Sequence, residues 1–577
     1  MALATRMYAA HGSPCGARIH PIIRKGRYVK DETMYIVYGP PGTGKTTYLA
    51  AKAKEFVAWA RERTPEWPTA VLISSLTRAA AAEIAGRDLG IPRRQVSTLH
   101  SHAYRCIPQP DIAVAHIDEF NREHPAYALG GEGGSNIDDP KWVWGRTGPG
   151  DEFSSTYHAL RAQCRPRDSW PGRVRGFARA WESWKQRNGY ADFDDLIERA
   201  FEHVPYAPGA PSIIIADEAQ DWSLLEYRLA KKWGRAAGHL IICGDPDQAI
   251  YTWRGADPEI FLDPDVPDEH RRVLGQSWRV PRAIQQMSMR WRALLSQAAN
   301  IDYKPRDADG AVERCVSTWR APDQAIALTE RYVADGKTVM LVGTCGYMLK
   351  PVVTELRDRA IPFANPWRRK RRDWNPLAPG RGVSMVDRML ALVRILQGEQ
   401  WSRADVHDWM VVMSSKLAGL KAEAKTRVAG HRNADDIIAD WDWIRGLVED
   451  DELQIALDFV WANNEAGLEQ WWFDRLLKRR ADTAEYPHRI LQARGSDALR
   501  ERPAVYVGTV HSFKGAEADV VILFPDLSPA GWRQWHGYGK GRDAVIRLFY
   551  VAMTRARERL IVCNPAGRSV PITQVMQ

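Results

Sequence analysis

Residues 39–46 read GPPGTGKT and directly follow a short apolar run at residues 34–38. This is the pattern GxxxxGK[ST], in which glycines let backbone N–H groups surround phosphate oxygens at a turn from a strand into a helix. The expected helix covers residues 46–60. Lys45 would reach the β- and γ-phosphates, and the Thr46 hydroxyl would ligate Mg²⁺. We predict a nucleoside triphosphate site at Gly39, Pro40, Pro41, Gly42, Thr43, Gly44, Lys45, Thr46 and Thr47, with a decayed loop as the alternative.

The composition indicates a large globular chain. Its 577 residues suffice for roughly four domain-sized units. A net charge of +9 favours a polyanionic partner such as nucleic acid. A soluble protein from an arginine-rich proteome would carry a similar excess, so charge alone does not decide between the two.

The cysteines argue against a zinc site or a disulfide framework, because no two of them form a CxxC pair. Cys243 and Cys563 lie in apolar runs and are expected to be core thiols. We expect a protein of the reducing cytoplasm, since no apolar run has the length of a membrane span or a signal sequence.

Short apolar runs rich in β-branched residues recur along the chain and are typical of buried parallel strands. They lie at residues 34–38, 70–74, 212–216, 239–243, 338–342, 505–508, 519–524 and 559–563. The runs form two groups, each interrupted by a long helix-rich stretch. The pattern therefore predicts an α/β protein with two parallel-sheet cores, each carrying a mainly helical inserted subdomain.

Two stretches outside the strands combine basic and aromatic residues. Residues 165–185 contain Trp170, Trp181 and Trp184, which could stack on bases. We favour the interpretation that these tryptophans belong to a helix core. The cluster WRRKRRDW at residues 367–374 is expected to be a solvated charge run, with phosphate contact as the alternative.

Acidic and aromatic residues follow two of the predicted strands. Asp217 and Glu218 end one strand, where one carboxylate can bind Mg²⁺ and the other can orient the attacking water. The next strand is followed by Gln248, Tyr251 and Trp253. This order suggests a sensor of the γ-phosphate linked to groups that stack.

At this point the chain resembles the superfamily 1 helicases of the UvrD/Rep type. The resemblance rests on GDPDQAIYTWRGA at residues 244–256 and DEAQD at residues 217–221. Further matches are residues 77–83 (motif Ia), 97–101 (Ib), 192–196 (DFDDL), 276–279 (IV), 509–517 (V) and 551–557 (VI). The resemblance implies two RecA-like cores and an ATP- and Mg²⁺-dependent DNA helicase that moves 3′→5′.

The resemblance also assigns roles around the nucleotide. Thr46 and Asp217 would hold Mg²⁺, Trp278 would stack on adenine and Glu517 would lie near the nucleotide. The catalytic residues would be Glu218 for the water, Gln248 as the γ-phosphate sensor, and Arg279 and Arg555 as two arginine fingers. DNA contacts would be Thr98, His100, Tyr251, Trp253, Arg254 and His511.

The implied subdomains are 31–102 with 191–278 (core 1A), 103–190 (1B), 279–395 with 501–577 (core 2A) and a short 396–500 (2B), after a lead-in at 1–30. No glutamine element that reads adenine is recognisable before Gly39, and no aromatic-tipped hairpin follows Arg555. Residues 531–538 are expected to be a surface loop, with strand separation as the alternative.

The expected partners are single-stranded DNA and single-strand/duplex junctions, and a monomer can in principle translocate. Repair and replication are the processes that such a motor serves. Two other functions stay open: a single-stranded DNA translocase that displaces proteins but unwinds poorly, and a nucleotide-gated DNA clamp.

Overall fold

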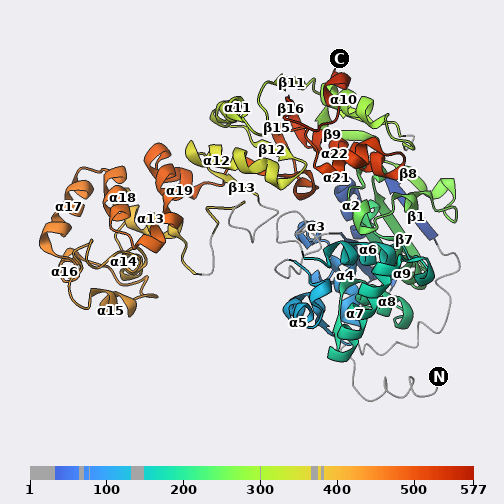
Figure 1. Ribbon diagram of the computed structural model, residues 1–577, viewed down its shortest axis with the longest axis horizontal. Helices are drawn as coiled ribbons and strands as arrows, with labels where there is room; N and C mark the ends of the chain where they lie inside the picture. The colour runs from blue at the N-terminus through green and yellow to red at the C-terminus, as the bar shows by residue number, and fades with distance from the viewer. Residues whose placement is uncertain are drawn as a thin grey trace.

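The computed structural model describes residues 33–63, 70–76, 78–130, 148–298, 301–365, 374–378 and 382–576. Two α/β units are joined to a helical unit that projects to one side (Figure 1). The expected lead-in at residues 1–30 lies outside the described residues, as do residues 367–373 of the basic cluster.

The first sheet has six parallel strands in the order β3-β2-β6-β7-β1-β8. They are β1 (Thr33–Tyr38), β2 (Val71–Ser75), β3 (Val96–Thr98), β6 (Ile213–Asp217), β7 (His239–Gly244) and β8 (Arg271–Val273). The apolar runs predicted in this part of the chain are confirmed as strands. One face packs on α2 (Lys45–Arg63) and α3 (Arg78–Ala85), and the other on α4 (Leu99–Cys106), α8 (Phe193–His203) and α9 (Leu224–Ala237).

The first insertion lies between α4 and α8 and has a small aromatic core of its own. It contains β4 (Asp111–Ile112), α5 (Ile117–Glu123), α6 (Asp151–Ala162), α7 (Gly172–Asn188) and β5 (Tyr190–Ala191). Trp170, Trp181 and Trp184 are buried there beside Phe120 and Phe177. The core interpretation of these tryptophans is confirmed, because their rings are not available to stack on bases.

A buried charge network fixes this insertion to the first sheet unit. The Asp192 carboxylate caps α8 and accepts hydrogen bonds from Trp181 Nε1 at 2.9 Å and Arg161 Nη1 at 3.1 Å. Lys185 contacts the carboxylates of Asp192 and Asp195. The DFDDL element at residues 192–196 therefore joins α6, α7 and α8.

The second sheet also has six parallel strands, in the order β11-β16-β15-β12-β14-β13. They are β11 (Ala311–Cys315), β12 (Val339–Gly343), β13 (Phe363–Ala364), β14 (Val505–Thr509), β15 (Ala518–Leu523) and β16 (Ala556–Cys563). α11 (Asp323–Ala334) and α12 (Lys350–Asp358) cover one face, and α10 (Arg282–Arg292) and α22 (Lys540–Met553) the other. The predicted class, two parallel-sheet cores of the RecA-like type, is confirmed. Cys243 and Cys563 are buried core thiols, as predicted.

The second insertion lies between β13 and β14 and is helical. Its helices are α13 (Met385–Val393), α14 (Arg403–Met410), α15 (Ala424–Ala429), α16 (Trp441–Arg445), α17 (Asp450–Trp461), α18 (Glu465–Asp474), α19 (Lys478–Arg494) and α20 (Asp497–Arg500). Their buried side chains continue the apolar cluster on the α11/α12 face of the second sheet. The insertion is therefore anchored through the second core.

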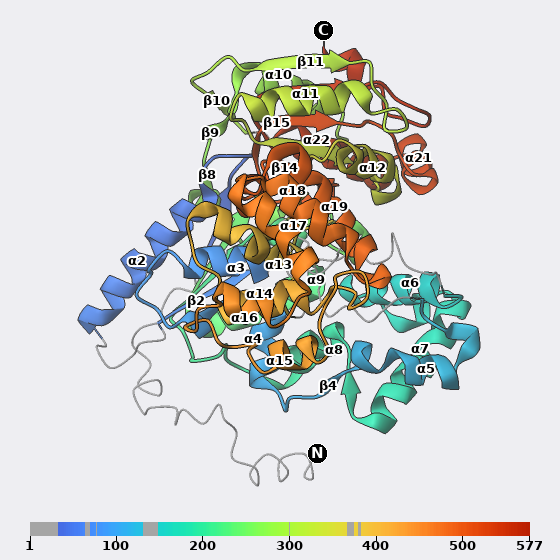
Figure 2. The ribbon, with the colours of Figure 1, turned by 90° about the vertical axis from the view of Figure 1, so that its left-hand side faces the viewer.

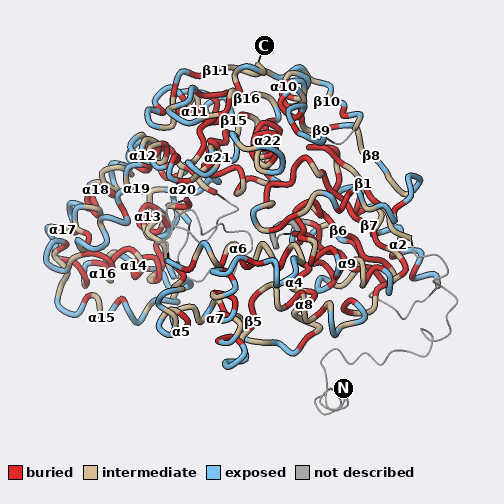
Figure 3. Tube along the Cα trace, turned by 45° about the vertical axis from the view of Figure 1, so that its right-hand side comes forward, coloured by how far each residue is buried: buried red, intermediate tan, exposed pale blue. Residues whose placement is uncertain are grey.

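The two cores share a continuous buried cluster. It includes Leu72 and Ile214 of the first sheet and Met340 and Val521 of the second. In Figure 2 the second sheet lies above the first, and the first insertion lies at the lower right. Buried segments follow the strands of both units in Figure 3, while exposed residues lie mainly on the outer helices and loops.

One expectation is wrong. Residues 531–538 do not form a surface loop, because most of them belong to α21 (Pro529–His536). The Trp535 ring stacks on Trp291 of α10 with centroids 5.6 Å apart and an interplanar angle of 10°. Tyr538, just beyond the helix, is 94% exposed.

No helix in the described part of the chain combines the length and the apolar character needed to cross a bilayer.

The second insertion supplies a matched pair for a stability test. Trp472 is fully buried and donates from Nε1 to the Trp409 carbonyl at 2.8 Å, whereas Trp461 is 68% exposed. We expect Trp472→Ala to lower the free energy of unfolding by about 3–5 kcal/mol, because it leaves a cavity. Trp461→Ala should change it by about 0.5 kcal/mol or less. Urea unfolding followed by circular dichroism measures both, and equal midpoints would contradict this packing.

Candidate active site

The phosphate loop connects β1 to α2 and is folded around its own lysine. Lys45 Nζ donates to the Gly39 carbonyl at 2.7 Å. A Cβ at Gly39 would lie 2.3 Å from Lys45 Cγ, so only glycine permits this approach. Gly42 and Gly44 have φ values of +73° and +77°, which glycine adopts without steric cost. The loop therefore makes tight turns at positions where only glycine fits.

A strand that belongs to neither large sheet closes one side of the loop. Among the strands that the structure describes, β9 (Gln276–Pro281) pairs with β10 (Lys304–Arg306) in a separate two-stranded sheet. The Trp278 amide donates to the Gly42 carbonyl at 2.8 Å, and Ser277 Oγ donates to the Pro41 carbonyl at 3.0 Å. A Cβ at Gly42 would lie 2.4 Å from Arg279 Cβ. Two predicted site residues, Trp278 and Arg279, are thereby held against the loop.

The indole of Trp278 is free to meet a flat ligand. It is 73% exposed, and its Cδ1 would lie 3.8 Å from a Cβ placed on Gly44. A large π-face beside a phosphate loop suits stacking on a nucleobase. Thr47, the last residue of the predicted loop set, is exposed and its hydroxyl accepts a hydrogen bond from Arg87 Nη1 at 3.1 Å.

The oxygen ligands predicted for Mg²⁺ are adjacent. Thr46 Oγ1 donates to Asp217 Oδ2 at 3.4 Å, and Asp217 is buried at the end of β6. Burial, followed by the charge of Glu218, raises the pKa of Asp217 to about 7. Hydroxyl and carboxylate oxygens are ligands of the kind that Mg²⁺ prefers, and a cation would offset the cost of burying this carboxylate. The pair therefore fits a magnesium ion.

Glu218 is held in an uncommon backbone conformation. Its φ is +55°, a left-handed value that is uncommon for non-glycine residues and costs backbone strain. Its carboxylate accepts from Gln220 Nε2 at 2.5 Å. Burial alone would raise the pKa of Glu218, but the charges of Lys45 and Lys514 outweigh it and leave the pKa below its usual value. A charged carboxylate in this position can orient a water molecule.

Gln248 joins the two cores. It lies in a short 3-10 helix after β7, and its Nε2 donates to Asp245 Oδ2 at 2.7 Å. Its Oε1 accepts from Nη2 of Arg555 at 2.9 Å. Arg555 follows α22 in the second core and is buried. Burial, together with the charge of Arg279, lowers the pKa of Arg555 to about 9.

Glu517 contacts the other predicted arginine finger, Arg279. Arg279 Nε donates to a carboxylate oxygen of Glu517, and Arg557 Nη1 lies 3.2 Å from the other oxygen. The structure thus brings Arg279, Arg555 and Glu517 to the same side of the phosphate loop. Arg279 lies on β9, so it belongs to neither large sheet, whereas Arg555 belongs to the second core.

Lys514 and Asp221 also belong to this site, although sequence reasoning gave them no role. The Lys514 ammonium contacts the Asp221 carboxylate, donates to the Gln248 carbonyl at 2.9 Å and lies 3.8 Å from Glu218 Oε2. Burial lowers the pKa of Lys514 to about 7. Both residues lie inside matched motifs, DEAQD and HSFKGAE. Their opposite charges are the sequence signal that could have indicated a contact between the two motifs.

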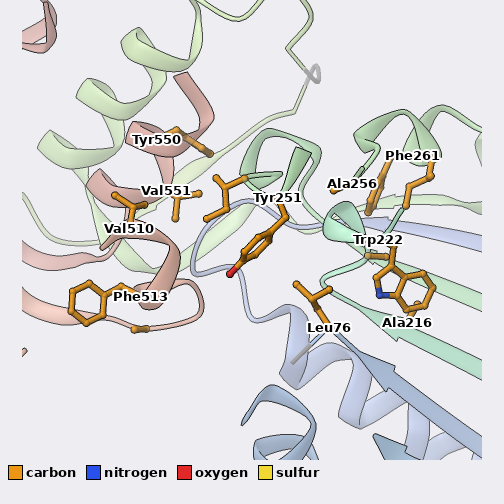
Figure 4. Packing of buried hydrophobic residues seen from close by; sticks show 14 of the residues in the cluster. Leu76, Ala216, Trp222, Tyr251, Ala256, Phe261, Val510, Phe513, Tyr550 and Val551 are labelled. Carbon is orange, nitrogen blue, oxygen red and sulfur yellow. The ribbon is translucent and has the colours of Figure 1, made fainter. Parts of the chain in front are cut away.

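Tyr251 lies between the two cores. Its hydroxyl donates to the His511 carbonyl at 3.2 Å, and the two rings are 5.7 Å apart. In Figure 4 Tyr251 points from the first core towards Val510 and Phe513 of the second. Trp253 is 36% exposed and its ring lies 6.4 Å from that of Tyr251, while the Arg254 guanidinium lies 5.8 Å from the Tyr251 ring centre. Of these aromatic rings, Trp253 is the one available to a nucleobase.

The other two predicted DNA contacts are buried in the first core. Thr98 Oγ1 accepts from the Ser101 amide at 3.3 Å and caps α4. His100 Nδ1 lies 3.5 Å from Glu226 Oε1, and burial lowers the pKa of His100. Both side chains therefore make internal contacts in this conformation.

The fold and the site define a class of protein. A phosphate loop and an acidic strand end on one core face an arginine from a second core, as in two-core P-loop nucleoside triphosphatases. Residues 27–254 match the family described as an AAA domain, and residues 504–563 match the UvrD-like helicase C-terminal domain. These two matches confirm the predicted resemblance to UvrD-like helicases of superfamily 1.

Individual relatives match over part of their length. A probable DNA helicase of Mycoplasma pneumoniae is 26% identical over 262 residues, which is 41% of this chain and 48% of the relative. The RecBCD enzyme subunit RecB of Mycobacterium tuberculosis is 29% identical over 30% of this chain and 17% of its own length. The ATP-dependent DNA helicase PcrA of Staphylococcus aureus is 37% identical over 17% of this chain and 15% of its own. The matched region thus spans at most about half of these relatives.

The contact between Lys514 and Asp221 gives a test of the core interface. Lys514→Met would leave Asp221 buried without its partner, so we expect it to lower the free energy of unfolding by about 3–5 kcal/mol. Arg557→Ala removes a half-exposed pair with Glu517 and should cost about 1 kcal/mol or less.

Urea unfolding followed by tryptophan fluorescence measures the two variants. Replacing both partners, as in Lys514→Met with Asp221→Leu, should recover part of the loss because no charge is then left unpaired. Similar midpoints for Lys514→Met and Arg557→Ala would rule out a buried interface pair.

Proposed function

We propose that the chain is an Mg²⁺-dependent ATPase that moves 3′→5′ along single-stranded DNA and separates duplex DNA at a junction. The observation that carries the proposal is the hydrogen bond of 2.9 Å between Arg555 of the second core and Gln248 of the first. It lies where a γ-phosphate would meet both cores. The 3′→5′ polarity rests on the family resemblance alone.

The chemistry follows from the charges around the loop. Lys45, Arg279 and Arg555 would stabilise the negative charge that develops on the transferred phosphoryl group. The Glu218 carboxylate would orient the attacking water and accept its proton. When bound by Thr46 and Asp217, Mg²⁺ would neutralise charge on the phosphate oxygens. Trp278 would stack on the base, which supports ATP as the nucleotide.

Coupling to DNA would run through the segment that follows Gln248. Three residues later Tyr251 contacts His511 of the second core, and Trp253 presents its exposed indole. A change at the γ-phosphate would therefore alter how the two cores hold a stacked base. Stacking tolerates any base, as a motor that passes over every nucleotide requires. Because its substrate would be DNA, we propose that the chain acts in the cytoplasm, in DNA repair or replication.

The first test measures ATP hydrolysis with and without single-stranded DNA, together with unwinding of duplexes that carry a 3′ or a 5′ tail. We expect DNA-stimulated hydrolysis and unwinding of the 3′-tailed duplex. Lys45→Ala should abolish hydrolysis while the chain stays folded. Hydrolysis without strand separation would favour a protein-displacing translocase, and binding without turnover would favour a nucleotide-gated clamp.

A second test concerns Trp253. We expect Trp253→Ala to keep basal hydrolysis and to weaken DNA binding by about 1–3 kcal/mol, the range for one stacked base. DNA stimulation of hydrolysis should fall with it. Trp461→Ala removes another exposed tryptophan, 68% exposed in the second insertion, and serves as the control. Unchanged DNA stimulation in Trp253→Ala would show that the stacking assignment is wrong.

A further inference from the structure

Two buried hydroxyls donate to one carbonyl of the phosphate loop. Tyr303 lies directly before β10, and its Oη donates to the Pro41 carbonyl at 2.8 Å. Ser277 Oγ of β9 donates to the same carbonyl at 3.0 Å. Both side chains are buried. Because a carbonyl oxygen has two lone pairs, the two hydroxyls together occupy the acceptor capacity of Pro41.

This pair of contacts fixes the orientation of a peptide bond inside the loop. The peptide between Pro41 and Gly42 is trans and planar, so its C=O and N–H point in opposite directions. Gly42 alone would not restrict that peptide, because glycine has the widest backbone freedom. Backbone N–H groups are what surrounds the phosphates in a loop of this pattern. The hydroxyls therefore set the direction of one such N–H group before any phosphate is bound.

Tyr303 is itself held in place. Gln285 Nε2 of α10 donates to the Tyr303 carbonyl at 2.8 Å. The following amide, that of Lys304, donates to the Gly275 carbonyl at 2.8 Å. The Tyr303 ring belongs to the buried cluster that the two cores share. The backbone and the ring thus give the hydroxyl a defined position against the loop.

The phenol of Tyr303 remains a hydrogen-bond donor at neutral pH. It is 6% exposed, and burial raises the pKa of Tyr303 above its ordinary value. The hydroxyl therefore keeps its proton wherever the neighbouring carboxylates and lysines carry out their chemistry. A buried hydroxyl without a partner would be unfavourable, so the Pro41 carbonyl is also what holds the phenol in place.

Both hydroxyls come from segments attached to the second core. β9 leads directly into α10, and β10 precedes β11 of the second sheet. In Figure 3 the two short strands lie beside α10. The phosphate loop, by contrast, follows β1 of the first sheet. The shape of the loop therefore depends on a contact with the second core as well as on its own glycines.

We propose that Tyr303 is a positioning residue for the nucleotide, whose hydroxyl holds the Pro41 carbonyl so that the Gly42 N–H is set to bind phosphate. The proposal rests on the proposed ATPase activity and adds to it a residue outside the matched motifs. The N–H would contact phosphate in the ground state and in the transition state alike. Loss of the hydroxyl should therefore weaken binding without slowing the chemical step.

The test is Tyr303→Phe, which removes the hydroxyl and keeps the ring. The matched control is Tyr486→Phe, because Tyr486 is also buried and its Oη donates to the Ile361 carbonyl at 2.6 Å, between α19 and the second core. Each variant loses one buried hydrogen bond from a tyrosine to a backbone carbonyl. Their urea midpoints should therefore shift by similar amounts, so a difference in nucleotide binding cannot come from stability.

Isothermal titration calorimetry gives the dissociation constant for ATP, and steady-state hydrolysis with single-stranded DNA gives KM and kcat. We expect Tyr303→Phe to raise the dissociation constant and KM by about 3- to 10-fold, the effect of one hydrogen bond. Its kcat should change by less than about 2-fold, as for lost uniform binding. Tyr486→Phe should keep the parent values. An ATP affinity of Tyr303→Phe equal to that of the control would overturn the proposal.

Inorganic tripolyphosphate separates the loop from the base site. It presents phosphate oxygens without a nucleobase, so Tyr303→Phe should weaken tripolyphosphate and ATP by the same factor. A loss of affinity for ATP alone would overturn the proposal, because the hydroxyl would then act through Trp278. Failure of the proposed function would look different, since the parent chain itself would not hydrolyse ATP.

Discussion

The hydrogen bond from Arg555 to Gln248 is the contact on which the rest of the site depends. It crosses from the second core to the first over 2.9 Å. Both side chains are buried, so their polar atoms need hydrogen-bond partners, and this bond provides one for each of them. Lys514 adds a second link to the Gln248 backbone, and the Tyr251 hydroxyl adds a third to the His511 carbonyl. The junction of the cores is thus made of groups that a nucleotide or DNA would also touch.

The site concentrates buried charge to a degree that stability alone would not favour. Lys45, Lys514 and Arg555 face Asp217, Glu218 and Asp221 in a small volume, and burying ions costs several kcal/mol each before pairing. Phosphate oxygens and a divalent cation would complete this set of charges. The left-handed Glu218 is consistent with a site shaped for chemistry. The unfavourable free energy of burying these charges is thus confined to the junction between the two cores.

Local sequence patterns predicted the strands and the phosphate loop because both depend on neighbouring residues. Residues 213–217, for example, form a buried strand because apolar β-branched side chains follow one another there. Contacts between residues that are distant in the sequence could not be predicted in this way. Lys514 and Asp221 are 293 positions apart, and no local sequence pattern indicates that they meet. His100 and Thr98 were predicted as DNA contacts from their motif, whereas their burial depends on α8 and α9 packing around them. α21 was missed because Pro529 and Gly531 lie in its first turn and Gly537 ends it, and proline and glycine are typical of loops.

We propose that nucleotide and DNA are sensed through one interface between the cores. The most direct measurement is the affinity of Glu218→Gln, which should bind ATP without hydrolysing it, for single-stranded DNA with and without ATP. We predict that ATP changes the affinity for single-stranded DNA by about 5- to 150-fold, and that DNA has an equal effect on the affinity for ATP. Adding Arg555→Ala should remove this coupling. The same DNA affinity with and without ATP, or coupling that survives the loss of Arg555, would show that the two ligands are not sensed through this interface.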